Sequence, residues 1–126
     1  MAEASLRIAV VDDDPAVLKA LSRLLRSRSL LARTFGSGGE FLAALKTDVP
    51  ECLIVDLQMP DMNGLELHEH LVSNGINIPT ILITAHGDAV SHPHGGGFVA
   101  RLRKPLQEET LFDAIDKAVG GSRGRR

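Results

Sequence analysis

Short runs of apolar residues alternate along the chain with longer segments in which apolar residues recur every three or four positions. Runs of the first kind indicate β-strands buried on both faces, and segments of the second kind indicate amphipathic helices. The expected strands cover residues 6–11, 30–35, 52–55, 79–84 and 98–102. The expected helices begin at Pro15, near Phe41, near Gly64 and near Gln107, and the last of them ends at Val119.

This order of elements predicts an α/β domain with a doubly wound, five-stranded parallel sheet covered by helices on both faces. The expected strand order is 2-1-3-4-5, as in flavodoxin-like folds. Residues 87–97 interrupt the pattern where a fourth helix belongs, because the three successive glycines 95–97 and Pro93 disfavour a helix. We therefore expect that helix to be short or disordered. In the strand that follows, alternation places Phe98, Ala100 and Leu102 on one face.

The composition is that of one globular domain of 126 residues with a formal net charge of -2. We expect the domain to span residues 1–121 and residues 122–126 to form a flexible basic tail. The net charge and the 3% aromatic content argue against non-specific nucleic-acid binding and base stacking. Cys52 is the only cysteine, so no intramolecular disulfide can form. No segment has the length of a membrane span, and we expect a cytoplasmic protein.

Polar residues follow four of the five predicted strands. Asp12 and Asp13 follow the first, Asp56 the third, Thr84 closes the fourth, and Lys104 comes just after the fifth. In a parallel sheet these strand ends lie along one edge, so three carboxylates, a hydroxyl and an ammonium are expected together. Clustered carboxylates repel one another unless a cation joins them, and hard oxygen ligands suit Mg²⁺. The sequence therefore predicts a Mg²⁺ site able to receive a phosphate oxygen.

These residues resemble a known family. The segments 10–14, 56–64, 83–85 and 104–105 look like the motifs of a response-regulator receiver domain of two-component signalling. The resemblance covers about residues 6–119. The sequence of residues 83–88 is most similar to receivers of FixJ-like transcriptional regulators. Four motifs in the right order on the right elements are far more specific than any one alone.

The resemblance implies a role for each residue of the cluster. Asp56 would be the phosphoacceptor that attacks a phosphohistidine of a sensor histidine kinase. Asp13 would bind Mg²⁺ directly, Asp12 would help directly or through water, and the backbone carbonyl of Gln58 would add a ligand. Lys104 would pair with the phosphoryl group. The chain would then be a regulator rather than an enzyme, with at most Mg²⁺-dependent self-phosphorylation and self-dephosphorylation.

The resemblance also implies how the signal would leave the site. Thr84 would bind a phosphoryl oxygen and swing inward, and the Lys104–Pro105 bond would be cis. The family usually places an aromatic switch residue three positions before the lysine, where this chain has Arg101. Phe98, on the inward face, would be a weak substitute. We therefore expect phosphorylation of Asp56 to give a weak or unconventional structural response in residues 86–100.

Two other functions remain open from the sequence. A degenerate receiver would act as a phosphorylation-independent interaction module. Arg101 and the glycine run favour this alternative, and it is opposed by the presence of the complete set Asp12, Asp13, Asp56, Thr84 and Lys104. A Mg²⁺-dependent phosphohydrolase commonly has a second acid two residues after the nucleophile, where this chain has Gln58. Nothing after residue 119 resembles a helix-turn-helix, so we expect no direct nucleic-acid binding by this domain. Since no segment has the length of a membrane span, we also expect no membrane contact. An output domain or downstream protein and a homodimer are left open as partners.

Overall fold

The structure, a computed structural model, describes residues 6–85 and 97–123, with side chains described up to residue 120. The strands are β1 (Arg7–Val11), β2 (Leu31–Phe35), β3 (Cys52–Asp56), β4 (Thr80–Thr84) and β5 (Phe98–Arg103). The helices are α1 (Pro15–Ser27), α2 (Gly38–Ala44), α3 (Gly64–Ser73) and α4 (Glu108–Arg123). All paired strands are parallel in the order β2-β1-β3-β4-β5, which confirms the predicted sheet.

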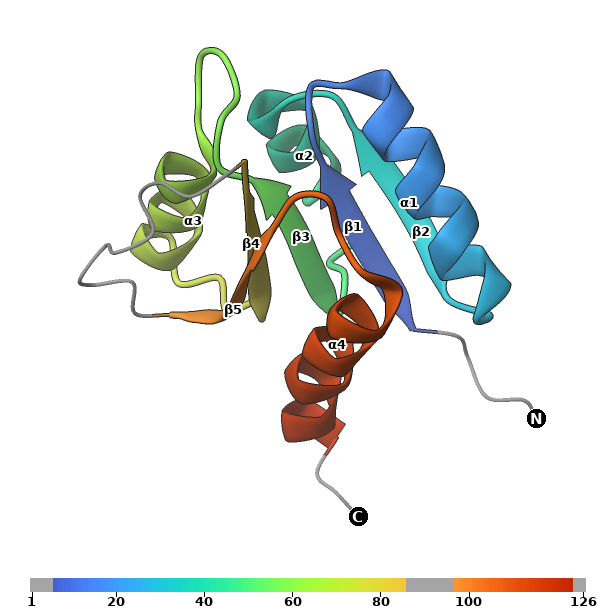
Figure 1. Ribbon diagram of the computed structural model, residues 1–126. Helices are drawn as coiled ribbons and strands as arrows, with labels where there is room; N and C mark the ends of the chain where they lie inside the picture. Colours follow the sequence, from blue (N-terminus) through green and yellow to red (C-terminus); the bar gives the residue numbers. More distant parts are fainter. Residues whose placement is uncertain (1–5, 86–96, 124–126) are drawn as a thin grey trace.

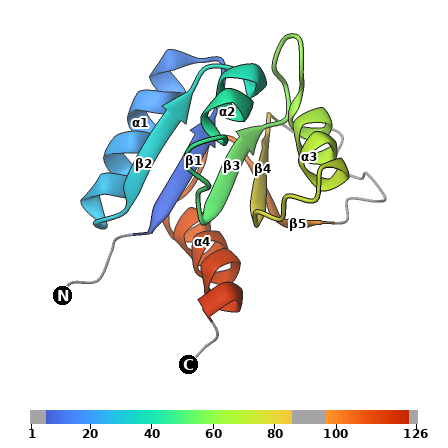
Figure 2. The ribbon, with the colours of Figure 1, turned by 180° about the vertical axis from the view of Figure 1, so that it is seen from behind.

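Helices cover both faces of this sheet (Figures 1 and 2). Side chains of successive strand residues point to opposite faces, so each strand supplies two separate cores. The core under α1 and α4 includes Ile8, Val10, Ile54, Ile81, Ile83, Leu25 and Leu111. The core under α2 and α3 includes Ala9, Val11, Leu53, Val55, Leu82, Phe41 and Leu67. This double burial explains why the central strands are apolar throughout.

Local capping fixes where the helices begin and end. Asp14 caps α1 by accepting a hydrogen bond from the amide of Ala16 at 2.9 Å, and Pro15 takes the first helical position as predicted. Ser37 caps α2 by accepting a hydrogen bond from the amide of Glu40 at 3.1 Å, so this helix begins at Gly38, ahead of the predicted start near Phe41. Gly75, with φ of 74°, ends α3 in the left-handed conformation expected there.

The predicted alternation along β5 is wrong at its first residue. The pairing of β5 with β4 shifts register, so that Thr80 lies opposite Phe98 while Ile81 lies opposite Ala100. Val99 is the extra residue and packs with Ala100 in the core beneath α4. Phe98 consequently points to the opposite face and packs in the core beneath α3. A one-residue bulge reverses the facing of every residue before it, and no local sequence pattern announced it.

The ends of the last two elements also differ from the prediction. β5 runs one residue further, to Arg103, and α4 begins at Glu108 and continues to Arg123. The helix passes through Gly120 and Gly121 because glycine lowers helix propensity by about 1 kcal/mol without itself ending a helix. Residues 122 and 123 are thus helical rather than part of a tail. The expectation of a short fourth helix in residues 87–97 falls, Gly97 apart, outside the described residues.

No helix in the described part of the chain is both long enough and apolar enough to cross a lipid bilayer.

The first residue of α3 tests how tightly this helix is set against β3. A Cβ at Gly64 would lie 2.7 Å from the carbonyl oxygen of Asp56 and 3.0 Å from Cδ1 of Leu82. We expect Gly64→Ala to lower the free energy of unfolding by about 1–3 kcal/mol, because backbone has to move. Gly120→Ala is the matched control in α4, where a Cβ meets nothing within 4 Å. It should raise stability by up to about 1 kcal/mol. Equal effects in urea unfolding would contradict the close contact at Gly64.

Candidate functional site

The polar residues predicted to follow the strands do meet at one edge of the sheet. Because the strands are parallel, their carboxyl ends share the edge marked by the arrowheads in Figure 1. Asp12 and Asp13 follow β1, Asp56 and Thr84 are the last residues of β3 and β4, and Lys104 follows β5. Asp12, Asp56 and Thr84 are buried, whereas Asp13 is exposed. The edge therefore holds two buried carboxylates with one carboxylate open to solvent beside them.

Asp12 is held by one oxygen only. Its Oδ1 accepts a hydrogen bond from the backbone amide of Asp14 at 2.9 Å. Its Oδ2 is buried and lacks a hydrogen-bond partner, although Nζ of Lys104 lies 3.5 Å away. That distance makes an ion pair without the geometry of a hydrogen bond. An unpartnered buried oxygen is costly, so this atom marks a place where a cation or a donor would be stabilised.

The surroundings of Asp56 disfavour its ionised form. Its Oδ1 accepts a hydrogen bond from the amide of Gln58 at 3.3 Å, and its Oδ2 lies 3.5 Å from Nζ of Lys104. Burial raises the pKa of Asp56, and the neighbouring charge of Asp12 raises it further. Lys104 and the Gln58 amide oppose this rise in pKa without cancelling it. The folded protein thus disfavours the ionised form of Asp56 until more positive charge arrives.

Lys104 brings a positive charge to the two buried carboxylates. Its Nζ is 3.5 Å from an oxygen of Asp12 and 3.5 Å from an oxygen of Asp56. Burial lowers the pKa of Lys104, but the two carboxylates outweigh burial and the net pKa is raised, so the ammonium stays charged. The Lys104–Pro105 peptide is cis, as the resemblance implied. The amide of Lys104 also donates to the carbonyl of Thr84 at 2.9 Å, which ties the two strand ends together.

The acidic residues fit a divalent cation. One carboxylate oxygen each from Asp12, Asp13 and Asp56 can be chosen so that all lie within 4.8 Å of one another. Ligands of Mg²⁺ stand about 2.0–2.1 Å from the ion, so opposite ligands are about 4 Å apart. The three oxygens are therefore close to bridging distance, and the unpartnered Oδ2 of Asp12 supplies an acceptor in need of a cation.

Two other sequence-predicted residues stand differently. Arg101 is exposed in β5, where it pairs with Leu82, two residues before Thr84. Gln58 contributes its backbone amide to Asp56, while its carbonyl as a metal ligand stays a prediction.

Sequence reasoning missed the support of the loop that follows Asp56. Asn63 accepts from the amide of Glu66 at 2.8 Å, and Glu66 accepts from the amide of Asn63 at 2.9 Å. This capping box starts α3 directly after the loop. The spacing Asn-x-x-Glu ahead of an apolar helix was the signal that could have found it. Gly64 then lets the helix approach the carbonyl of Asp56.

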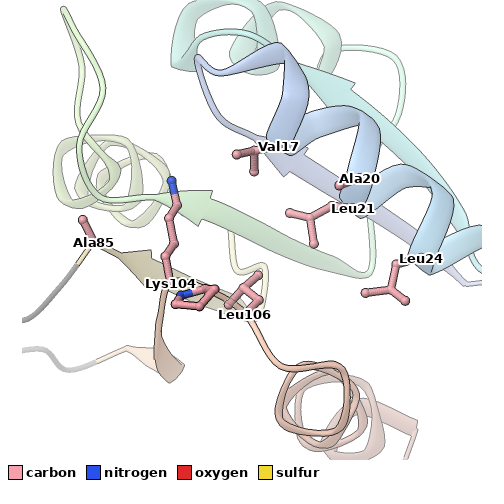
Figure 3. Close-up of a pocket in the computed structure, with 8 residues that line it drawn as sticks. Val17, Ala20, Leu21, Leu24, Ala85, Lys104 and Leu106 are labelled. Atoms are coloured by element: carbon pink, nitrogen blue, oxygen red, sulfur yellow. The ribbon is translucent and has the colours of Figure 1, made fainter.

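An apolar groove of about 560 Å³ lies beside the cluster (Figure 3). Its lining residues come from α1, from the end of β4 and from the segment that follows β5: Val17, Ala20, Leu21, Leu24, Ala85, Lys104, Pro105 and Leu106. Lys104 belongs to both the groove and the carboxylate cluster. The sequence did not reveal the groove, because the apolar pattern of α1 does not show which of its residues stay uncovered.

Comparison with known proteins gives a consistent result. The sequence model of one protein family, the response regulator receiver domain, matches residues 8–116 of this chain. Nodulation protein W of Bradyrhizobium diazoefficiens is 38% identical over 119 residues, which cover 93% of this chain and 52% of that protein. Response regulator protein TmoT of Ectopseudomonas mendocina is 42% identical over 115 residues, 89% of this chain and 52% of TmoT. The chain thus spans about half the length of these relatives.

Solved structures agree with the sequence matches. The crystal structure of FixJ-N is 33% identical with a TM-score of 0.83, and the match covers 92% of this chain and 94% of FixJ-N. The response regulator receiver protein from Burkholderia phymatum is 39% identical with a TM-score of 0.82, covering 92% of this chain and 96% of that one.

The raised pKa of Asp56 has a measurable consequence for stability. Where the unfolded carboxyl is ionised and the folded one still holds its proton, the folded state binds more protons, so stability falls as pH rises. Asp56→Asn removes this penalty. We expect the variant to gain stability over wild type as pH rises above the ordinary carboxyl pKa of about 4, without divalent cations.

Urea unfolding at several pH values measures that difference. Asp61→Asn is the matched control, since Asp61 is exposed in the same loop and has φ of 70°, which asparagine tolerates. Adding Mg²⁺ should shrink the advantage of Asp56→Asn, because the cation binds the ionised wild-type cluster. A difference that stays constant with pH would rule out an electrostatic origin.

Proposed function

This chain belongs to the response regulator receiver domain family, and we propose that within a two-component system Asp56 accepts a phosphoryl group from a histidine kinase in the presence of Mg²⁺. The observation that carries the proposal is the arrangement of charge at the strand ends. Asp56 is buried beside Asp12, whose Oδ2 lacks a hydrogen-bond partner, and Lys104 stands 3.5 Å from both carboxylates. Such a site is short of positive charge and gains from a cation and a bound phosphoryl group together.

The transfer itself asks the protein for positioning rather than covalent assistance. An Asp56 oxygen attacks the phosphorus of a phosphohistidine, a P–O bond forms, and the P–N bond breaks. The imidazole of the kinase leaves with the electron pair and takes up a proton from solvent. The amide of Gln58 holds one Asp56 oxygen by a hydrogen bond of 3.3 Å, which limits rotation of the carboxylate. The attacking group is thus oriented before the partner arrives.

Asp12, Asp13, Asp56 and the carbonyl of Gln58 are the groups that would hold the metal. When bound, Mg²⁺ supplies charge neutralisation for the carboxylates and for the phosphoryl oxygens. Asp13 is exposed, so water can reach its carboxylate. Asp12 is buried, and its carboxylate is fixed by a hydrogen bond from the amide of Asp14. This division leaves one side of the cluster open to an incoming phosphoryl group.

Lys104 and Thr84 would bind the oxygens of the phosphoryl group once it is on Asp56. The Lys104 ammonium is a compact charge on a flexible stem, so it can turn from the carboxylates to a phosphoryl oxygen. Thr84 ends β4 with a buried hydroxyl residue beside that position. The Lys104 amide donates to the Thr84 carbonyl at 2.9 Å, so a displacement of Thr84 at the end of β4 also displaces the backbone of Lys104.

The complete set of Asp12, Asp13, Asp56, Thr84 and Lys104 supports a phosphoacceptor over the interaction module that the sequence left open. A module that worked without phosphorylation would have no need of the buried, charge-deficient pair. Receiver domains are signalling regulators rather than enzymes in the usual sense, and a phosphohydrolase is disfavoured by Gln58 where a second acid would stand.

The partners follow from the same proposal. TmoT is named a response regulator and TdiR of Thauera aromatica a transcriptional regulatory protein, and each is about twice the length matched here. We infer a sensor histidine kinase upstream and an output domain or downstream protein that regulates transcription. A cytoplasmic location and a homodimer stay predictions, as does a weak response through Arg101.

Chemical phosphorylation tests the phosphoacceptor directly. Incubation with acetyl phosphate and Mg²⁺ should add one phosphoryl group per chain by intact mass, because Asp56 is the one proposed nucleophile. Asp56→Asn should lose the label entirely, while Asp61→Asn keeps it. Lys104→Ala should retain slow labelling, about 10²-fold below wild type, since it removes a charge from the developing phosphoryl oxygens. Undiminished labelling of Asp56→Asn would overturn the assignment.

The groove beside Lys104 gives a test of how the kinase docks. A phosphohistidine must come within bonding distance of Asp56, so a partner surface has to cover the neighbouring groove on α1. Ala20 is exposed in that lining, and Ala20→Glu places a charge where apolar contact is expected. We expect transfer from a cognate kinase to fall by about 10-fold or more while labelling by acetyl phosphate is unchanged.

Ala43→Glu is the matched control, because Ala43 is exposed on α2 across the sheet. It should leave both reactions unchanged. If Ala20→Glu impaired acetyl phosphate labelling to the same degree, the groove would have no separate role in docking.

A further inference from the structure

His68 of α3 and Phe98 of β5 make a ring contact that the phosphoacceptor site does not explain. Their ring centroids are 4.3 Å apart and the planes are inclined by 32°. The contact exists because the bulge at Val99 turns Phe98 toward α3 instead of α4. It joins the middle of α3 to the first residue of β5, at the opposite end of that strand from Lys104.

The backbone ahead of Phe98 fits directly against the same imidazole. Gly97 has φ of 102°, a conformation that favours glycine. A Cβ at this position would lie 2.7 Å from Cε1 and 3.2 Å from Nε2 of His68. No side chain separates the ring from the Gly97 backbone. His68 therefore meets two successive residues at the point where the chain enters β5.

The surroundings of His68 favour a neutral ring. A cleft of about 520 Å³ adjoins it, and the other lining residues carry no titratable group: Leu71, Val72, Ile76, Asn77, Ile78, Pro79 and Gly97. Burial lowers the pKa of His68, and the charge of Glu69 on the same helix opposes this effect without reversing it. The first charged residue along β5 is Arg101, which is exposed. Glu69 is the charged group whose effect on the pKa of His68 is resolved.

We propose that His68 is a proton-sensitive clasp: the neutral ring holds Gly97 and Phe98 against α3, and protonation releases the start of β5. A protonated imidazole needs water at both nitrogens, and the open cleft gives the ring room to turn toward solvent. Leaving the stack removes the surface against which Gly97 is packed. The inference goes beyond phosphoryl transfer, since it requires neither Asp56 nor a metal.

A competing effect acts in the opposite direction. An imidazolium above a phenyl ring gains a cation–π attraction of about 0.5–1 kcal/mol at a partly exposed site. If that attraction exceeded the cost of desolvation, protonation would tighten the contact instead of opening it. The two outcomes differ in sign, so a titration distinguishes them.

The test is an NMR titration of the whole 126-residue chain, observing the imidazole and backbone resonances. His70 is exposed on the same helix and is the site of the control variant. We expect His68 to titrate below the ordinary pKa of an imidazole, because burial lowers its pKa. The cross-relaxation peak between Hε1 of His68 and the α protons of Gly97 should be present at neutral pH and lost once His68 is protonated.

Two variants separate the clasp from other titrating groups. His68→Phe keeps an aromatic ring that takes no proton, so the amide resonances of Gly97 and Phe98 should no longer move over the range in which His68 titrates. His70→Phe should leave that movement intact. The proposal is overturned if His68 titrates above the ordinary imidazole pKa, if the Gly97 contact survives protonation, or if His68→Phe leaves the pH-dependent movement of the Gly97 and Phe98 resonances unchanged.

Discussion

The site depends on one electrostatic constraint, the burial of two carboxylates with too little positive charge. Asp12 and Asp56 lie at neighbouring strand ends, and Lys104 stands 3.5 Å from an oxygen of each. One ammonium shared at that distance leaves the pKa of Asp56 raised and one oxygen of Asp12 without a hydrogen-bond partner. The fold tolerates this because packing elsewhere is extensive, and a cation together with a phosphoryl group relieves it. The same two buried carboxylates thus lower the stability of the fold and provide the site for the cation and the phosphoryl group.

The rest of the fold serves to hold those strand ends in place. Double burial fixes the register of β1, β3 and β4, since a slip of one residue would move every side chain to the other core. The capping box of Asn63 and Glu66 and the close approach of Gly64 set α3 directly behind the carbonyl of Asp56. The amide of Lys104 bonds to Thr84, which joins the cation to the hydroxyl. Rigid elements therefore carry the reacting groups, while the lysine stem supplies the needed freedom.

Much of this could be predicted from the sequence, because parallel strands bring their ends to one edge whatever their exact lengths. Asp12, Asp56, Thr84 and Lys104 were found by that rule alone. Phe98 was assigned to the wrong face since a bulge changes the facing of residues before it, and the pairing that creates it is not local. The groove on α1 was hidden because a helix pattern shows which residues are apolar but not which neighbour covers them.

The central claim concerns what the cluster binds, and a crystal structure grown with Mn²⁺ and beryllofluoride tests it most directly. Mn²⁺ has ligand preferences close to those of Mg²⁺ and an anomalous signal that identifies it. The account predicts one Mn²⁺ touching Asp13 and Asp56, with Asp12 beside it, and a beryllofluoride group on Asp56 within reach of Lys104 and Thr84. An ordered cluster at saturating Mn²⁺ with no anomalous peak there, and with Lys104 still bridging Asp12 and Asp56, would contradict it.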